Sequence, residues 1–155
     1  MGRLRQVARS ETDDPFVLGM YDLIFGKDVD PVGNEATSTS TGSAGDWWTT
    51  HALSPDILEH AVAGFAMYRS PKRVVDGVLR ELAQTRIGWC AGSKFVFSQH
   101  VQALRGLGAD LAKIRDIASW QTSDAYTRTE RAVLAYADAI ALEAGRVSDE
   151  LFEAL

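Results

Sequence analysis

Residues 71–105 read PKRVVDGVLRELAQTRIGWCAGSKFVFSQHVQALR, and this stretch decides the predicted fold. Apolar residues recur every three to four positions on both sides of a short Gly-Ser turn at 91–93, which is the spacing of a buried helix face. We predict a first helix over 71–91, opened by Ser70-Pro71, and a second over 93–105 that ends at a glycine. The apolar stripe of the first helix is Val74, Val75, Val78, Leu79, Leu82 and Ile87.

Helix signals continue on both sides of this pair. The predicted further helices cover 14–25, 55–69, 109–119 and 127–144, and a short last helix begins after Ser148. No alternating run of β-branched residues is long enough to predict a strand. The expected fold class is therefore all-α, a bundle or array of helices.

One segment of low complexity divides the chain. Residues 26–46 read GKDVDPVGNEATSTSTGSAGD and contain almost no large apolar side chains, which predicts a mobile loop. A loop of this length is unusual inside a compact domain, so a lid and an arm reaching a neighbour both stay open. We predict an N-terminal extension over 1–45, with a short helix and this flexible loop, and a helical domain over 46–155.

Composition restricts the partners. The 155 residues include 16 basic and 21 acidic side chains, a net charge of −5, which argues against a nucleic-acid-binding surface. No apolar stretch approaches the roughly 20 residues that span a bilayer, so no membrane partner is expected. The single cysteine, Cys90, excludes an internal disulfide framework, and a cytoplasmic location is the default expectation.

Glu81 and His100 are the most credible chemical pair. Glu81 shares a predicted helix face with Val78 and Thr85, and His100 lies on the next helix beside Phe97. Packing of the two helices would bring the carboxylate to the imidazole, and a carboxylate that orients an imidazole is a general acid–base unit. The alternative is a solvated surface glutamate and a core histidine that binds a backbone carbonyl.

Other candidates carry weaker signals. Lys94, four residues after Cys90, would favour a thiolate, but the end of a helix disfavours one, so Cys90 is expected to be a small buried residue. His51 and His60 lack partners at ligand spacing, and we expect no metal site. No phosphate-binding or dinucleotide-binding motif is present, so no cofactor is expected either. Trp89 and Phe97 belong to a set of aromatic residues that suits a core or an apolar ligand pocket.

The stretch ELAQTRIGWCAGSKFVFSQHVQALRGLGADLAKI at 81–114 resembles the core of the carboxymuconolactone decarboxylase family, which includes alkyl hydroperoxidase D. Residues 129–155 resemble the downstream half of that family, and DWWTTHALSPDILEHAVAGFAMYRSP resembles its lead-in. The resemblance covers about 46–155 and implies an all-helical array of the alkyl hydroperoxidase D-like type. Family chains usually continue with one more helix, so the resemblance implies a domain without its last helix.

The redox branch of the family has cysteines where this sequence has Ser93 and Val96, whereas its flanking acid and histidine are retained as Glu81 and His100. The decarboxylase branch manages without the cysteine pair, and it resembles a cofactor-free enzyme that acts on a small lactone acid by proton transfer. Such a substrate needs a cationic anchor, for which Arg80, Arg86 and Lys94 are all candidates. The resemblance also implies a homo-oligomer, a trimer or a hexamer.

Three hypotheses follow. The first is a cofactor-free enzyme acting on a small organic acid or lactone, with His100 as acid or base, Glu81 as its orienting group and Ser93 as a hydrogen-bond donor to substrate. Arg86, Lys94, Trp89 and Phe97 would bind that substrate. The second is a thiol-dependent hydroperoxide reductase, which requires an exposed Cys90 with a lowered pKa. The third is a non-catalytic helical oligomer or ligand-binding module, which predicts that Glu81 and His100 lie too far apart for any hydrogen bond.

Overall fold

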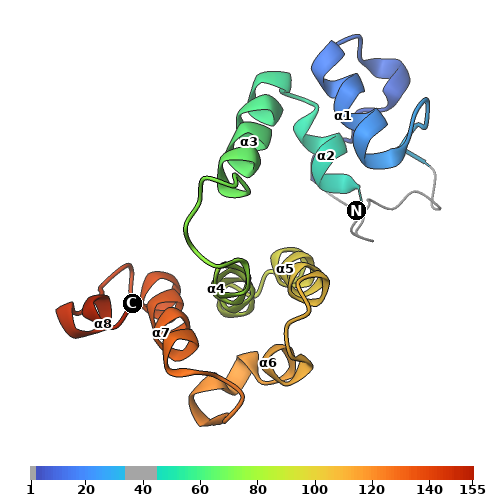
Figure 1. The fold of residues 1–155 in the computed structure, drawn as a ribbon. Coiled ribbons are helices and arrows are strands. Elements are labelled where there is room, and N and C mark those ends of the chain that lie inside the picture. The colour runs from blue at the N-terminus through green and yellow to red at the C-terminus, as the bar shows by residue number, and fades with distance from the viewer. Residues whose placement is uncertain (1–2, 34–44) are drawn as a thin grey trace. The chain divides into compact units, whose positions relative to one another are not determined.

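The computed structural model describes residues 3–33 and 45–155, and all regular elements in these ranges are helical, which confirms the all-α prediction. The α-helices are α1 (Pro15–Phe25), α2 (Asp46–His51), α3 (Pro55–Tyr68), α4 (Gly77–Cys90), α5 (Lys94–Gly106), α6 (Leu111–Arg115), α7 (Arg128–Leu142) and α8 (Asp149–Glu153) (Figure 1). Two 3-10 helices, η1 (Arg9–Glu11) and η2 (Ile117–Thr122), complete the set.

The chain forms two compact units, Met1–Val74 and Val75–Leu155. Helices α2 and α3 therefore group with the N-terminal residues, although the sequence predicts a division after residue 45. That predicted division concerns the extent of the family domain and stays a prediction.

The N-terminal unit is organised around Tyr21. This side chain is fully buried, and its hydroxyl donates a hydrogen bond of 2.7 Å to the carbonyl of Val7. The buried residues that surround it are Val7, Val17, Ala52 and Leu58. Helix α1 begins as predicted, because the Asp14 carboxylate accepts hydrogen bonds from the first turn and proline occupies the first helical position. Residues 34–44 of the predicted loop over 26–46 lie outside the described residues; before them the chain makes a turn at 27–28 and a bend at 32–33.

The C-terminal unit is built on α4, which packs against α5, α7 and η2 (Figure 1). Its core is a cluster of buried side chains from five segments: Leu82, Leu104, Ile117, Tyr126 and Leu134. Helix α7 begins within one residue of its predicted start, with a capping box between Thr127 and Glu130, and Gly145 follows it with φ 80°. The helix predicted over 109–119 is instead two short pieces: α6 ends at Arg115 with Asp116 as its C-cap, and η2 follows with a kink at Ser119.

The predicted start of the central helix at residue 71 is wrong. Helix α4 begins at Gly77, where the Asp76 carboxylate accepts hydrogen bonds from the amides of Val78 and Leu79. The Ser70 hydroxyl accepts only the Lys72 amide, which closes a turn. Val74 and Val75, which the sequence placed on the buried stripe, are 98% and 58% exposed. β-branched neighbours favour a helix poorly, and the aspartate cap supplies the stronger start signal.

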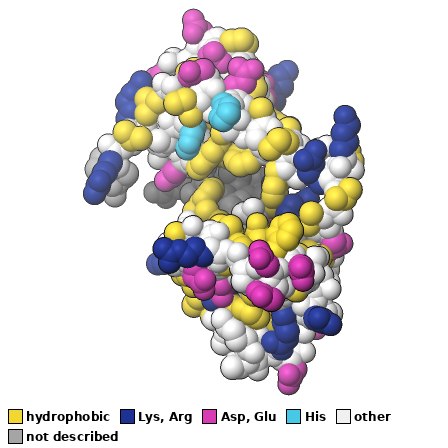
Figure 2. Space-filling view, turned by 90° about the vertical axis from the view of Figure 1, so that its left-hand side faces the viewer, with side chains coloured by type: hydrophobic (Ala, Val, Ile, Leu, Met, Phe, Trp, Pro, Cys, Tyr) yellow, Lys and Arg dark blue, Asp and Glu magenta, His cyan; other side chains and the backbone are white. Residues whose placement is uncertain are grey.

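The surface carries apolar side chains among charged ones, as Figure 2 shows for one face. In the C-terminal unit the exposed large apolar side chains include Val75, Leu107 and Leu111 and two further sets. The first is the α4–α5 corner with Trp89 and Phe95, and the second is the end of the chain with Ile140, Leu142, Phe152 and Leu155.

Candidate active site

The structure brings Glu81 and His100 together. Nδ1 of His100 on α5 lies 2.6 Å from Oε2 of Glu81 on α4. The Glu81 side chain is 5% exposed and the His100 side chain is 22% exposed. Two side chains that are nineteen residues apart thus form one short, largely buried ion pair or hydrogen bond. The third hypothesis expects a longer separation, and this expectation is wrong.

The second carboxylate oxygen of Glu81 also has a partner. Nε of Arg80 donates to Oε1 at 3.2 Å. A buried carboxylate is costly unless each oxygen accepts a hydrogen bond or meets a positive charge. Arg80 and His100 meet this need from two sides, so the Glu81 side chain is held in one orientation.

The contact with Glu81 determines which ring nitrogen of His100 is available for proton transfer. When the Glu81 carboxylate is ionised it only accepts hydrogen bonds, and Nδ1 then carries the proton that lies between the two groups. Nε2 has no hydrogen-bond partner among the described residues. In the neutral imidazole Nε2 is consequently the basic nitrogen, and in the imidazolium it is the free donor. This is the arrangement of a histidine prepared for proton transfer.

Gly88 sets the distance between the two helices. A Cβ atom built on Gly88 would lie 2.7 Å from the backbone nitrogen of Phe97, which is closer than real Cβ contacts. Helices α4 and α5 therefore approach each other backbone to backbone at this point. The Gly92 turn, with φ 63°, and the Ser93 cap begin α5 directly after α4, so the two helices run back along each other. This hairpin brings the face with Glu81 to the face with His100.

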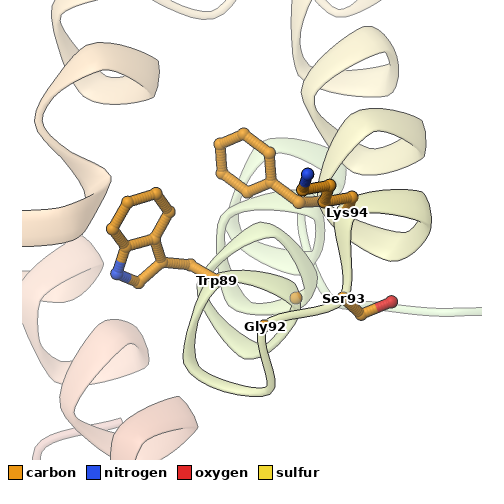
Figure 3. Close-up of a pocket in the computed structure, with 6 residues that line it drawn as sticks. Trp89, Gly92, Ser93 and Lys94 are labelled. Carbon is orange, nitrogen blue, oxygen red and sulfur yellow. The ribbon is translucent and has the colours of Figure 1, made fainter.

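A cavity of about 280 Å³ opens at the α4–α5 corner. Its lining consists of Gly88, Trp89, Gly92, Ser93, Lys94 and Phe97 and is mostly apolar. Trp89 projects from the end of α4, while Ser93 and Lys94 come from the start of α5 (Figure 3). Three of the four residues expected to bind substrate, and the expected donor Ser93, thus border a single cavity.

Ser93 has a local structural role. Its hydroxyl oxygen accepts the Val96 amide at 3.3 Å and so caps α5. In Figure 3 this hydroxyl is directed away from the Trp89 ring. The donor role of Ser93 toward substrate stays a prediction.

Arg86 lies elsewhere and is engaged by the protein. Nε and Nη2 donate to the two carboxylate oxygens of Asp138 on α7, at 2.5 and 3.0 Å, and Nη1 donates to the carbonyls of Ile117 and Ala118. All three nitrogens therefore bind protein acceptors, and the side chain is 7% exposed. The expectation that Arg86 anchors a substrate carboxylate finds no support in this geometry, and Lys94 is the better candidate.

Cys90 belongs to the same polar network. Its thiol donates to Oδ1 of Asp138 at 3.5 Å, and its side chain is half-buried. Burial raises the pKa of this thiol, and the neighbouring Asp138 carboxylate raises it further, although the Arg86 charge acts in the opposite direction. A one-cysteine peroxidase needs the opposite shift, so the geometry disfavours the second hypothesis.

Asp138 is the acceptor at the centre of this polar network, and the sequence patterns did not identify it. It accepts hydrogen bonds from Arg86, Cys90, the Trp120 indole at 3.0 Å and Gln121 at 3.4 Å. Burial alone would raise its pKa, but the hydrogen bonds from Arg86 and Trp120 hold it below its ordinary value. The signal available in the sequence was an aspartate between two alanines, Ala137 and Ala139, within a predicted amphipathic helix.

Residues 3–33 and 45–155 contain neither a metal-binding cluster nor a membrane-spanning helix. No group of three or more histidine, cysteine, aspartate or glutamate side chains in these ranges is arranged to hold a metal ion. None of the helices there combines the length and apolarity needed to cross a bilayer.

Comparison with known proteins places the fold. The model of the carboxymuconolactone decarboxylase family matches residues 57–139, which is more than half of the 155 residues. The chain therefore belongs to the carboxymuconolactone decarboxylase family. No curated protein matches the sequence significantly.

Among solved structures, the chain is similar to the crystal structure of a cysteine-to-alanine variant of the debrominase Bmp8 in complex with 2,3,4-tribromopyrrole. The TM-score is 0.65 with 20% sequence identity, over 100% of this chain and 74% of that chain. Similarity at this level of identity concerns the fold alone.

Proposed function

We propose that this protein is a cofactor-free enzyme that transfers protons to or from a small organic acid or lactone through His100 and Glu81. The observation that carries the proposal is the 2.6 Å contact between His100 Nδ1 and Glu81 Oε2, with Nε2 left without a partner among the described residues. Membership of a decarboxylase family supports enzymatic activity in general.

The residues of the proposed site divide into a proton-transfer group, its supporting groups and the groups that would bind the substrate. Nε2 of His100 takes a proton from a carbon acid, or returns one to the carbanion that loss of CO2 leaves behind. Glu81 fixes the ring orientation and stabilises the imidazolium, and Arg80 keeps the second oxygen of Glu81 in place. Lys94, Trp89 and Phe97 border the cavity at the α4–α5 corner and would bind the substrate.

The test is proton exchange in heavy water. The protein is incubated with a panel of small lactone acids and organic acids, and NMR follows replacement of carbon-bound hydrogen by deuterium together with product formation. His100→Asn is the informative variant, because the amide nitrogen of asparagine overlays Nδ1 and can still donate to Glu81, whereas Nε2 is gone. Its rate should fall by roughly 10²–10⁴-fold.

His60→Asn is the matched control, since His60 is exposed on α3 in the other compact unit. It should keep the full rate. Full activity of His100→Asn on a true substrate would sink the proposal.

We also propose that the protein works as a homo-oligomer, a trimer or a hexamer, with a small molecule as its other partner. The exposed apolar side chains at the end of the chain, Phe152 at 69% and Leu142 at 59%, support a protein–protein contact there. Light scattering after size-exclusion chromatography tests this, and a monomer at all concentrations would refute it.

A further inference from the structure

The second half of α3 is apolar on every side. Residues 61–68 read AVAGFAMY, about two turns of helix without a charged side chain. A helix that is apolar all round is normally enclosed by other elements. Within α3, however, only Leu58 is buried, whereas Ile57 is 54% exposed and Met67 is 64% exposed.

One face of α3 packs inside the N-terminal unit. Leu58 belongs to the buried cluster of that unit, Val62 packs against the cluster, and the Phe65 ring centroid lies 5.4 Å from that of Trp47. These positions follow one another at four and three residues, which is one helix face. A second set, Ile57, Gly64 and Met67, follows at seven and three residues and forms another face, here called the outer stripe.

Gly64 lies in the middle of the outer stripe. Glycine destabilises a helix interior relative to alanine, so its presence there needs a packing reason. A Cβ atom built on Gly64 would meet nothing within 4 Å, and packing inside the protomer therefore does not require glycine. Glycine does allow another backbone to approach closely. The position suits a second helix that crosses α3 at this point.

The charges at the two ends of α3 are opposite. Asp56 and Glu59 lie near its start. Arg69 follows its last residue, and Lys72 and Arg73 come directly after. These five side chains are exposed, and the three cations form no salt bridge with the part of the chain that the structure describes. A second α3 running antiparallel would place the acidic end of each helix beside the basic end of the other, and the two helix dipoles would also oppose each other favourably.

We propose that α3 pairs antiparallel with the α3 of a second copy of this chain, outer stripe against outer stripe, about a two-fold axis. Ile57 of each copy then lies against Met67 of the other, and the axis passes close to Gly64. The inference rests on the proposed homo-oligomer and deepens it. Two-fold axes relate the subunits of a hexamer built from two stacked trimers and are absent from a cyclic trimer, so the pairing favours the hexamer.

Cysteine cross-linking tests the direction of the pairing. Ile57→Cys/Met67→Cys, made in a Cys90→Ser background, carries two thiols ten residues apart on one helix, about 15 Å, which is too far for an internal disulfide. Antiparallel pairing brings each thiol to the other thiol of the second copy, and mild oxidation should give a covalent dimer. In each single-cysteine variant the equivalent thiols lie about 15 Å apart along the helices and should cross-link little. Equal cross-linking by the single variants would overturn the antiparallel arrangement.

Light scattering after size-exclusion chromatography tests the contact itself. Met67→Glu places a charge in the outer stripe and should halve the mass of the assembly. Ala66→Glu adds the same charge at an exposed position of α3 that is turned by about 100°, and it should leave the mass unchanged. Because both side chains are exposed in the protomer, circular dichroism should show the same helix content for both variants. An unchanged mass of Met67→Glu would overturn the inference.

The charges at the ends of α3 have a test of their own. Lys72→Glu reverses a charge that would face the acidic end of the other α3, and it should raise the dissociation constant of the pairing by about two- to fivefold at low salt. Arg105→Glu makes the same reversal in the exposed last turn of α5 and should leave the constant unchanged. An equal effect of both variants would reflect net charge alone and would contradict the proposed direction.

The outcomes separate this inference from the proposed function. A wild-type trimer that Met67→Glu leaves intact would overturn the α3 pairing and retain the proposed oligomer. A wild-type dimer that Met67→Glu splits would retain the pairing and remove the proposed trimer or hexamer. A monomer at all concentrations would overturn both. The proposed catalysis by His100 is tested by deuterium exchange, which none of these measurements uses.

Discussion

Gly88 of α4 lies against the backbone of Phe97 in α5, and no larger residue fits between the two helices as they stand. The atoms nearest to a Cβ at Gly88 would be Phe97 N at 2.7 Å, Phe97 Cα at 3.0 Å and Val96 Cγ1 at 3.1 Å. Backbone atoms cannot rotate away as the end of a side chain can. The same approach fixes the distance between the helices that carry Glu81 and His100.

Gly88→Ala should therefore lower the free energy of unfolding by about 2 kcal/mol, within the usual cost of overpacking a core. Gly106→Ala is the control, because a Cβ there meets nothing within 4 Å. It should leave stability unchanged or raise it by up to about 1 kcal/mol. Urea unfolding of the two variants tests this, and equal stabilities would contradict the steric argument.

The ion pair between Arg86 and Asp138 should contribute more to the free energy of unfolding than an exposed ion pair does, because it is largely buried. Asp138→Asn keeps the shape of the side chain but leaves the guanidinium, which is 7% exposed, without its counter-charge. Removing one partner of a buried pair costs about 3 kcal/mol or more. Asp124→Asn, at an exposed position of the same unit, should change the unfolding free energy by less than about 0.5 kcal/mol. Comparable midpoints for the two variants in urea would contradict this prediction.

The lowered pKa of Glu130 should make the free energy of unfolding depend on pH. Burial would raise the pKa of this carboxyl, but the hydrogen bonds from Lys113 and from the Thr127 amide hold it below its ordinary value of 4.5. The unfolded state consequently binds a proton first as the pH falls, so the contribution of Glu130 is complete above 4.5 and is lost as the pH drops through the folded-state value.

Glu130→Gln lacks this titration. The wild-type protein should exceed the variant by about 1–2 kcal/mol at neutral pH, and the difference should shrink in acid. Urea unfolding of both proteins over a series of pH values measures it. A difference that grows in acid would mean that the pKa is shifted in the other direction.

Cys90 should be a slow nucleophile. Because burial and the Asp138 carboxylate raise the pKa of its thiol, alkylation by iodoacetamide at neutral pH should be several-fold slower in the folded protein than in urea. Hydroperoxide and a thiol reductant should give no turnover with either the wild-type protein or Cys90→Ser. Peroxide loss that disappears in Cys90→Ser would instead make Cys90 the reactive centre.

Local sequence signals predicted most of the helices and the candidate pair. The caps at Asp14, Ser93 and Thr127 involve neighbours within three residues, so their effect is legible in the sequence. The Glu81–His100 contact was also predictable, because a short turn joins the two helices and their apolar faces determine which side chains meet.

Two other features were beyond sequence reasoning for physical reasons. Ser70 and Asp76 are both possible caps for α4, and the hydrogen bonds of Asp76 together with the exposure of Val74 show that the helix begins after Asp76. Arg86 and Asp138 are 52 residues apart, so their pairing depends on how α7 packs on α4. The local sequence pattern contains no information on that packing. Arg86 was therefore predicted to bind the substrate, because its partner Asp138 could not be foreseen.

The concentration of hydrogen bonds on Asp138 has an evolutionary consequence. The Asp138 carboxylate accepts hydrogen bonds from Arg86 and Cys90 of α4 and from Trp120 of η2. Replacing Asp138 would therefore leave several donors without an acceptor at once. Residues that share one acceptor are energetically coupled. We therefore expect Asp138, Arg86 and Trp120 to change together between descendants of this protein, whereas Lys94 at the cavity is free to change alone and to alter which ligands are accepted.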